Sequence, residues 1–133
     1  MNALGGGELN ALSEKIVGAA IAVHRELGPG LLESAYEACL EFELIDRGLR
    51  VERQKELPLQ YRGVRLNCGY KLDLLVEGCI ILEIKAVDKL HPIHEAQLLS
   101  YLKLTGCHLG LLLNFNVKML KDGIKRLVLN FPA

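Results

Sequence analysis

Residues 71–85, KLDLLVEGCIILEIK, decide how this sequence folds. They join two largely apolar segments, residues 66–76 and 79–86, through a Glu77-Gly78 turn. Short apolar runs that are bounded by turn residues are typical of buried strands. The stretch therefore predicts a β-hairpin inside the core of a sheet.

Three charged residues interrupt these apolar strands: Asp73, Glu83 and Lys85. Residues two apart in a strand share a face, so Glu83 and Lys85 project together. If the hairpin brings Asp73 opposite Glu83, the two carboxylates lie about 5 Å apart on that face. Like charges at this distance repel by roughly 1 kcal/mol in water and several-fold more when partly buried. A divalent cation would turn this cost into a binding site, and hard oxygen ligands suit Mg²⁺.

Local turn chemistry leaves two registers open. A three-residue loop, Glu77-Gly78-Cys79, pairs Asp73 with Glu83, whereas a two-residue turn shifts the pairing by one and sends Asp73 to the other face. A plainer interpretation also stands, in which Glu83 and Lys85 are a surface pair on a half-exposed strand. The charged residues alone do not choose between these arrangements.

The rest of the chain predicts a mixed α/β class. Apolar residues at helical spacing predict a helix over residues 9–27, a second one from residue 31 to Gly48, and a third over about 93–105. Residues 49–61 predict an edge strand with a break at Pro58. Residues 108–115, HLGLLLNF, predict a central strand buried on both faces, and residues 124–131 a last strand.

Length and composition limit the organisation of the chain. Its 133 residues suffice for one domain, which we expect over residues 9–133 after a flexible glycine-rich tail over residues 1–8. No apolar run approaches the roughly 20 residues that span a bilayer, and no N-terminal signal is evident, so we expect a cytoplasmic protein. The four cysteines lack zinc-site spacing and are expected to be small buried hydrophobes.

Three motifs together resemble those of a known superfamily. Asp73, followed after nine residues by Glu83-Ile84-Lys85, resembles the PD-(D/E)xK nuclease motif, with Leu72 in place of the proline. Residues 30–36, GLLESAY, match the signature of the bacterial GxxExxY protein family, and residues 97–101, QLLSY, resemble the QxxxY helix motif of RecB-like nucleases. The resemblance covers about residues 24–115. It implies a restriction-endonuclease-like αβββαβ core, with a mixed central sheet flanked by helices.

The resemblance also implies a Mg²⁺-dependent nuclease, with Mn²⁺ as a substitute ion. Asp73, Glu83 and the backbone carbonyl of Ile84 would hold the metal. Lys85 would orient or help deprotonate the attacking water and steady charge on the phosphate. Glu33 would be a ligand to a metal or to its water.

The helix motif implies a role for Gln97 and Tyr101, which would contact the scissile phosphate or fix the neighbouring ligands. They are four residues apart and share a helix face. Structural interpretations stand beside these roles. A glutamate such as Glu33 is favoured in the first turn of a helix by the helix dipole, and Gln97 and Tyr101 could be a surface pair. Tyr36 is expected in the core. His24 is a candidate to contact the residues that bind the metal or the substrate without touching either itself.

The substrate implied by the resemblance is nucleic acid, DNA more than RNA. Sixteen basic and sixteen acidic residues balance, so only a local basic face could attract it. The chain has no Trp, so we expect no base-stacking platform. A core this small engages a duplex most easily as a homodimer. The alternative function is a catalytically silent, nuclease-like scaffold that binds nucleic acid or a protein partner. Two basic groups could form the local face: Arg47, Arg50, Arg53, Lys55, Arg62 and Arg65, and Lys118, Lys121, Lys125 and Arg126.

Overall fold

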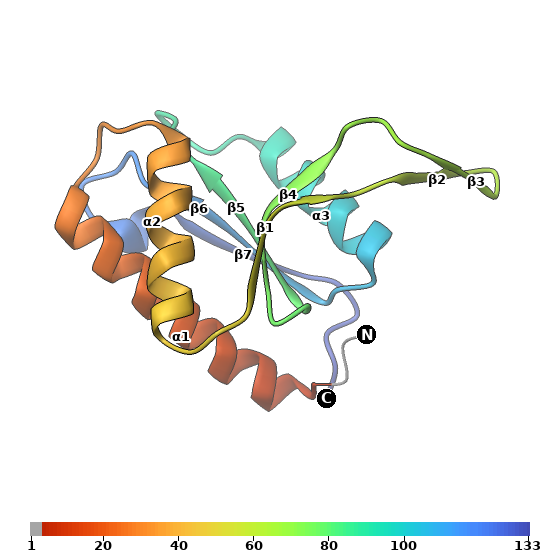
Figure 1. Ribbon diagram of the computed structural model, residues 1–133, viewed down its shortest axis with the longest axis horizontal. Coiled ribbons are helices and arrows are strands. Elements are labelled where there is room, and N and C mark those ends of the chain that lie inside the picture. Colours follow the sequence, from red (N-terminus) through yellow and green to blue (C-terminus); the bar gives the residue numbers. More distant parts are fainter. Residues whose placement is uncertain (1–3) are drawn as a thin grey trace.

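A five-stranded mixed sheet between helices forms the body of the protein, in a computed structural model that describes residues 4–133 (Figure 1). The strand order is β1-β4-β5-β6-β7, and a separate hairpin of β2 and β3 extends from one side. The helices are α1 (Gly6–Leu27), α2 (Glu33–Asp46) and α3 (Pro92–Thr105), with a short 3-10 turn, η1 (Leu120–Gly123). The strands are β1 (Val51–Glu56), β2 (Leu59–Tyr61), β3 (Val64–Leu66), β4 (Lys71–Val76), β5 (Ile80–Lys85), β6 (Leu109–Asn114) and β7 (Ile124–Val128).

The two central strands confirm the mixed sheet. β5 pairs in parallel with β6, and α3 makes the crossover between them. The other neighbouring strands of this sheet pair antiparallel. Every residue of β6 is buried, as the apolar sequence of this segment predicts for a strand covered on both faces.

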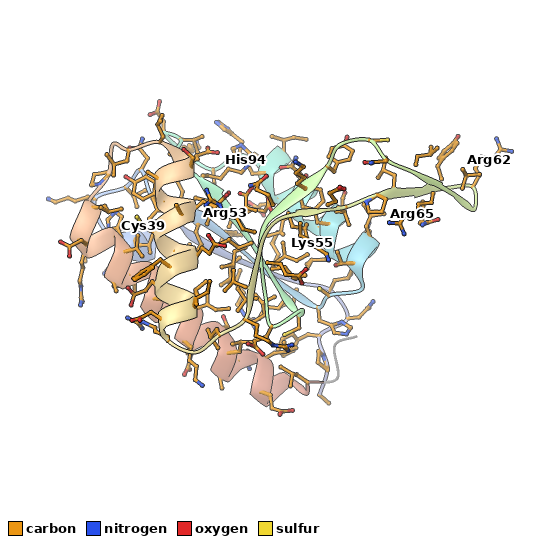
Figure 2. All side chains as sticks on the ribbon, viewed as in Figure 1. Cys39, Arg53, Lys55, Arg62, Arg65 and His94 are labelled. Atoms are coloured by element: carbon orange, nitrogen blue, oxygen red, sulfur yellow. The ribbon has the colours of Figure 1, made fainter. Side chains whose placement is uncertain are left out.

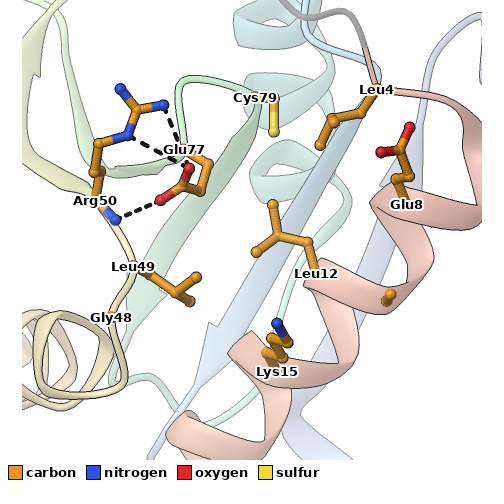
Figure 3. Close-up of a pocket in the computed structure, with 10 residues that line it drawn as sticks. Leu4, Glu8, Leu12, Lys15, Gly48, Leu49, Arg50, Glu77 and Cys79 are labelled. Atoms are coloured by element: carbon orange, nitrogen blue, oxygen red, sulfur yellow. Dashed lines mark hydrogen bonds and ion pairs between the residues drawn. The ribbon is translucent and has the colours of Figure 1, made fainter.

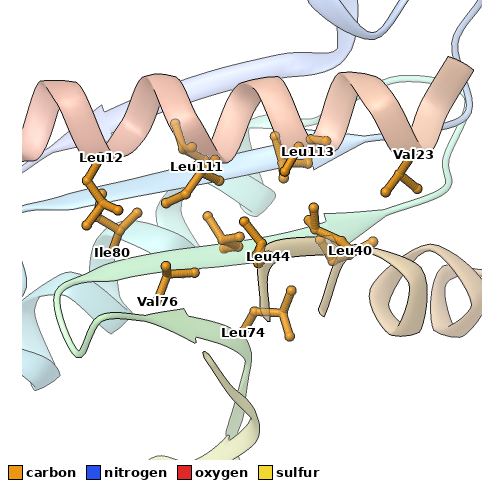
Figure 4. Packing of buried hydrophobic residues seen from close by; sticks show 14 of the residues in the cluster. Leu12, Val23, Leu40, Leu44, Leu74, Val76, Ile80, Leu111 and Leu113 are labelled. Carbon is orange, nitrogen blue, oxygen red and sulfur yellow. The ribbon is translucent and has the colours of Figure 1, made fainter. Parts of the chain in front are cut away.

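Each face of the sheet carries its own hydrophobic core. Alternate side chains of β5, such as Ile80 and Leu82, pack with Leu40 and Leu44 of α2 and with apolar residues of α1 (Figure 4). Ile81 projects from the opposite face into a smaller core beneath α3. Since residues two apart share a face, Glu83 and Lys85 also lie on the α3 side of β5.

The turn between β4 and β5 sets the register that the sequence left open. Val76 pairs with Ile80, which leaves the three-residue loop Glu77-Gly78-Cys79 between the strands. Glu77 and Gly78 both have positive φ, of 53° and 67°. Leu74 pairs with Leu82. The next residues along the two antiparallel strands are Asp73 and Glu83, which therefore lie across from one another on the same face of the sheet.

Some boundaries differ from those expected from the sequence. α1 begins at Gly6 instead of residue 9, so the last part of the expected tail is helical, and residues 1–3 of that tail lie outside the described residues. The expected strand over residues 66–76 is divided by a loop between β3 and β4. Two cysteines, Cys79 and Cys107, are buried as expected, but Cys39 and Cys68 are exposed, and Cys39 lies on the surface of α2 (Figure 2). No helix in residues 4–133 is long and apolar enough to cross a membrane.

Candidate metal and catalytic centre

Two carboxylates meet where β4 and β5 stop pairing through their main chains. Beyond Leu74 and Leu82, the main-chain N–H of Asp73 donates to the Glu83 carboxylate at 3.1 Å. The N–H of Ile84 donates to the Asp73 carboxylate at 2.8 Å. Each acid therefore accepts a hydrogen bond from the strand of the other. Glu83 is only 4% exposed.

Burial and mutual repulsion disfavour the ionised form of this pair. Burial raises the pKa of Glu83 to about 8, and the negative charge of Asp73 adds to the effect. Burial likewise raises the pKa of Asp73, although the hydrogen bond from the Ile84 N–H opposes the rise. Without a cation, the centre therefore retains a proton near neutral pH. The structure thus shows the close approach of two carboxylates, with its electrostatic repulsion, that the charged residues of the two strands suggested.

Lys85 lies next to the carboxylates. Its positive charge favours ionisation of both Asp73 and Glu83, although less than burial opposes it. Within the described part of the chain, Lys85 forms no ion pair shorter than 4 Å. Its ammonium is therefore available to a substrate that approaches the carboxylates.

Glu37 on α2 belongs to the same charged centre, although no motif in the sequence assigned it a role. It is 6% exposed, and its charge raises the pKa of both Asp73 and Glu83. Arg53 Nε donates to its carboxylate at 2.6 Å. A signal existed in the sequence, because Glu37 follows Glu33 by four residues and so lies on the same helix face.

Gln54 links Glu37 to Asp73. Its amide nitrogen donates to both carboxylate oxygens of Glu37, at 2.9 and 3.0 Å, and to Asp73 at 3.4 Å. Its φ is +54°, a left-handed conformation that is uncommon outside glycine. The pairing of β1 with β4 holds on either side, at Arg53 with Leu74 and at Lys55 with Leu72, but is broken at Gln54 and Asp73. Backbone strain at such a site is consistent with a functional constraint.

Glu33 begins α2 beside the end of β5, where its carboxylate accepts a hydrogen bond from the Ala86 N–H at 3.1 Å. The loop before it is fixed by Tyr36, which is fully buried as expected. The Tyr36 hydroxyl donates to the Gly28 carbonyl at 2.6 Å and accepts from the Leu31 N–H at 3.0 Å. The spacing of Glu33 and Tyr36 thus places an acid at the edge of the centre and anchors the loop that carries it.

α3 contributes Tyr101 from the opposite side of the centre. Its pKa is raised by burial and by the charges of Glu83, Tyr70 and Asp73, so its hydroxyl stays protonated and able to donate. Tyr101 is only 6% exposed, so it is not a surface residue. Gln97 lines a groove of about 540 Å³ together with Tyr101 and Tyr70.

His24, a candidate from the sequence, and His94 both form hydrogen bonds within the fold. The His24 ring hydrogen-bonds to the Val117 carbonyl at 2.8 Å and contacts Phe115. His94 receives a hydrogen bond from the His91 N–H at the start of α3, and burial and the charge of Lys85 lower its pKa. A separate hollow beside the β4–β5 turn contains the ion pair of Arg50 and Glu77 (Figure 3).

The donor set suits a hard divalent cation with few protein ligands. Among residues 4–133, no group of three or more His, Cys, Asp or Glu side chains is placed to hold a metal ion. Asp73 and Glu83 supply two carboxylates, and Mg²⁺ commonly binds through one or two carboxylates plus waters. A cation would also relieve the repulsion that raises the pKa of Glu83. The residues present therefore fit such an ion.

Comparison with known proteins gives one family. A family model described as the PD-(D/E)XK nuclease superfamily matches residues 10–127, which include most of α1, every element from α2 to η1 and nearly all of β7. No curated protein and no solved structure shows a significant match to the chain.

Proposed function

This chain belongs to the PD-(D/E)XK nuclease superfamily, and on that premise we propose that it is a Mg²⁺-dependent nuclease that hydrolyses DNA phosphodiester bonds. The observation that carries the proposal is the pair formed by the buried Glu83 and the half-buried Asp73, which repel one another beside Lys85. A structural protein gains nothing from this repulsion, whereas a cation-dependent hydrolase needs both the negative charge and the neighbouring ammonium.

The metal would be held by Asp73 and Glu83, with the backbone carbonyl of Ile84 as a further ligand. Mn²⁺ would substitute for Mg²⁺. When bound, the ion supplies a Lewis acid that lowers the pKa of a coordinated water and neutralises charge on the phosphate. Glu33, which holds the Ala86 N–H, would orient a water at the margin of the centre.

Lys85 would position the attacking water and donate hydrogen bonds to phosphate oxygens as negative charge develops on them. Tyr101, which keeps its proton, would donate to the same phosphate or to a ligand carboxylate. Gln97 would contact the phosphate from the groove that it lines. Gln54 would hold Asp73 in place through its amide.

Cleavage of supercoiled DNA tests this proposal. Purified protein should nick or degrade the DNA with Mg²⁺ or Mn²⁺ and leave it intact with EDTA. Asp73→Ala and Lys85→Ala should each lower the rate by at least about a hundred-fold, while Lys103→Ala, an exposed lysine on α3, should not. Wild-type rates in both folded variants at the centre would falsify the proposal. The same assay on RNA of matched sequence tests the preference for DNA, and sedimentation tests a homodimer.

The second candidate is a scaffold that binds nucleic acid or a protein partner without cleaving. Its supporting observation is the sparse ligand set: among the described residues, no third His, Cys, Asp or Glu is placed to hold a metal ion together with the two carboxylates. This function predicts metal binding in calorimetry together with intact DNA and RNA under every metal tested.

A further inference from the structure

The hairpin of β2 and β3 extends away from the body of the protein (Figure 1), and we call residues 59–66 the arm. It forms a two-stranded sheet of its own, and all of β3 is exposed. Large apolar side chains on it remain in solvent, with Tyr61 62%, Val64 55% and Leu66 41% exposed. An isolated hairpin with exposed apolar side chains gains little stability from its own contacts, which indicates a surface made for binding.

The two faces of the arm differ in chemistry. Cross-strand pairs share a face, so Leu59 and Leu66 lie with Tyr61 and Val64 on an apolar face. Gln60 and Arg65 form the other face. The arm thus presents apolar and aromatic groups on one side and polar, positively charged groups on the other.

Each face of the arm meets a hollow that a neighbour of the acidic centre also lines. On the apolar side, Leu59 lines the groove that also contains Tyr70, Gln97 and Tyr101. On the polar side, Arg65 lines a second hollow along β1, and that hollow includes Gln54, whose amide donates to Asp73. The arm therefore adjoins two hollows, one containing Tyr101 and the other Gln54, and both of these residues interact with the carboxylates.

The arginines of the arm have no ion-pair partner within 4 Å among the described residues. Arg62 lies at the tip and Arg65 along the strand (Figure 2). Arg62 follows Tyr61 in the chain at the tip, and Arg65 lies on the opposite face of the same hairpin. Two guanidinium groups on a hairpin that also exposes an aromatic ring complement a ligand that carries both phosphates and planar rings.

We propose that the arm, together with Tyr70 in the loop before β4, binds an unpaired segment of the nucleic-acid substrate, with bases stacked on Tyr61 and Tyr70 and phosphates held by Arg62 and Arg65. This inference rests on the proposed nuclease function. An unpaired strand fits better than a duplex, because bases stacked inside a duplex do not offer their faces to a side chain. In this proposal Tyr61 and Tyr70, which is 44% exposed, would supply a stacking surface without Trp.

Binding in EDTA, where the proposed cleavage cannot proceed, isolates this interaction. The probe is a fluorescein-labelled oligothymidine of about 12 nucleotides, compared by anisotropy with a hairpin duplex of equal length. Tyr61→Ala should weaken binding of the single strand roughly ten-fold, and Tyr61→Phe should preserve it. Phe42→Ala is the matched control, because Phe42 is 70% exposed on α2, outside the arm.

Salt dependence tests the arginines separately. The affinity of a protein for a single strand falls as salt rises, and each cationic side chain that neutralises a phosphate adds about 0.7 to the steepness of log affinity against log salt concentration. Replacing both Arg62 and Arg65 by Ala should therefore make that slope shallower by about 1.4. Circular dichroism of each variant checks that the body of the protein keeps its fold.

Three results would overturn the inference: wild-type affinity in Tyr61→Ala, tighter binding of the duplex than of the single strand, or a dimer in sedimentation that Tyr61→Ala dissociates. The last would show that a second copy covers the apolar face. Failure of the nuclease proposal is distinguishable, since a protein that cleaves nothing can still lose single-strand binding in Tyr61→Ala. Conversely, arm variants that bind and cleave normally leave the nuclease proposal intact.

Discussion

Glu83→Gln removes one charge from the acidic centre and little else. The substituted amide has the shape of the carboxylate, and its oxygen can still accept the hydrogen bond from the Asp73 N–H that measures 3.1 Å. Its nitrogen can donate to Asp73, where the wild-type pair repels. We therefore expect the variant to be more stable than the wild type at alkaline pH without metal.

The pKa of Glu83 fixes the direction and the size of this effect. Burial and Asp73 raise it from 4.5 to about 8 in the folded protein. The folded state then binds the proton more tightly than the unfolded chain, so stability is greatest below the ordinary pKa and falls as pH rises through the folded one. At about 1.4 kcal/mol for each pH unit between the two pKa values, the loss has a ceiling of roughly 5 kcal/mol. The raised pKa of Asp73 acts in the same direction.

Urea unfolding in EDTA between about pH 5 and pH 9 measures this dependence. The wild type should lose several kcal/mol of unfolding free energy over that range, and Glu83→Gln should lose much less. The exposed Glu56→Gln is the control and should follow the wild type. Mn²⁺ at alkaline pH should restore stability to the wild type alone, because a ligand that binds only the folded state stabilises it. Parallel pH curves for wild type and Glu83→Gln would refute the electrostatic reasoning.

Three other substitutions probe the support of the centre and of the surrounding fold. Gln54→Gly keeps the left-handed backbone without strain and removes the amide that donates to Asp73. The affinity for Mn²⁺, measured by calorimetry, should fall roughly ten-fold, and an unchanged affinity would show that Gln54 does not position Asp73. Tyr36→Phe deletes a buried hydroxyl that hydrogen-bonds to two loop residues. Urea unfolding should show a loss of about 1–3 kcal/mol in unfolding free energy, and an unchanged value would mean that other contacts fix the loop. Gly123→Ala drives a Cβ into the Asn114 carbonyl oxygen; the melting temperature should drop, and an unchanged value would contradict this close approach.

The hairpin could be predicted because its charges stand out against an apolar background. Its register could not, since it depends on Glu77, a residue without glycine's conformational freedom, adopting φ of 53° in a three-residue loop. The sequence therefore identified Asp73, Glu83 and Lys85 as one group only on the condition of an odd loop. The structure meets that condition, and their roles in catalysis stay proposals.

Residues that reach the centre through tertiary contacts were harder to find. Gln54 adjoins Asp73 only because β1 pairs with β4 in one register, and that pairing is broken where the two residues meet. Glu37 reaches the same place from α2, since the helix packs across the sheet. Tyr101 was named from a motif, but its burial beside the carboxylates depends on the crossover between β5 and β6.

The exchange of hydrogen bonds between the two strands has a consequence for observing the centre. The N–H groups of Asp73 and Ile84 are held by carboxylate oxygens in place of main-chain carbonyls. Any ion that draws those oxygens toward itself competes with the two amides for the same lone pairs. Deuterium uptake or nitrogen chemical shifts at the backbone amides of Asp73 and Ile84 would therefore report whether an ion is bound at the centre.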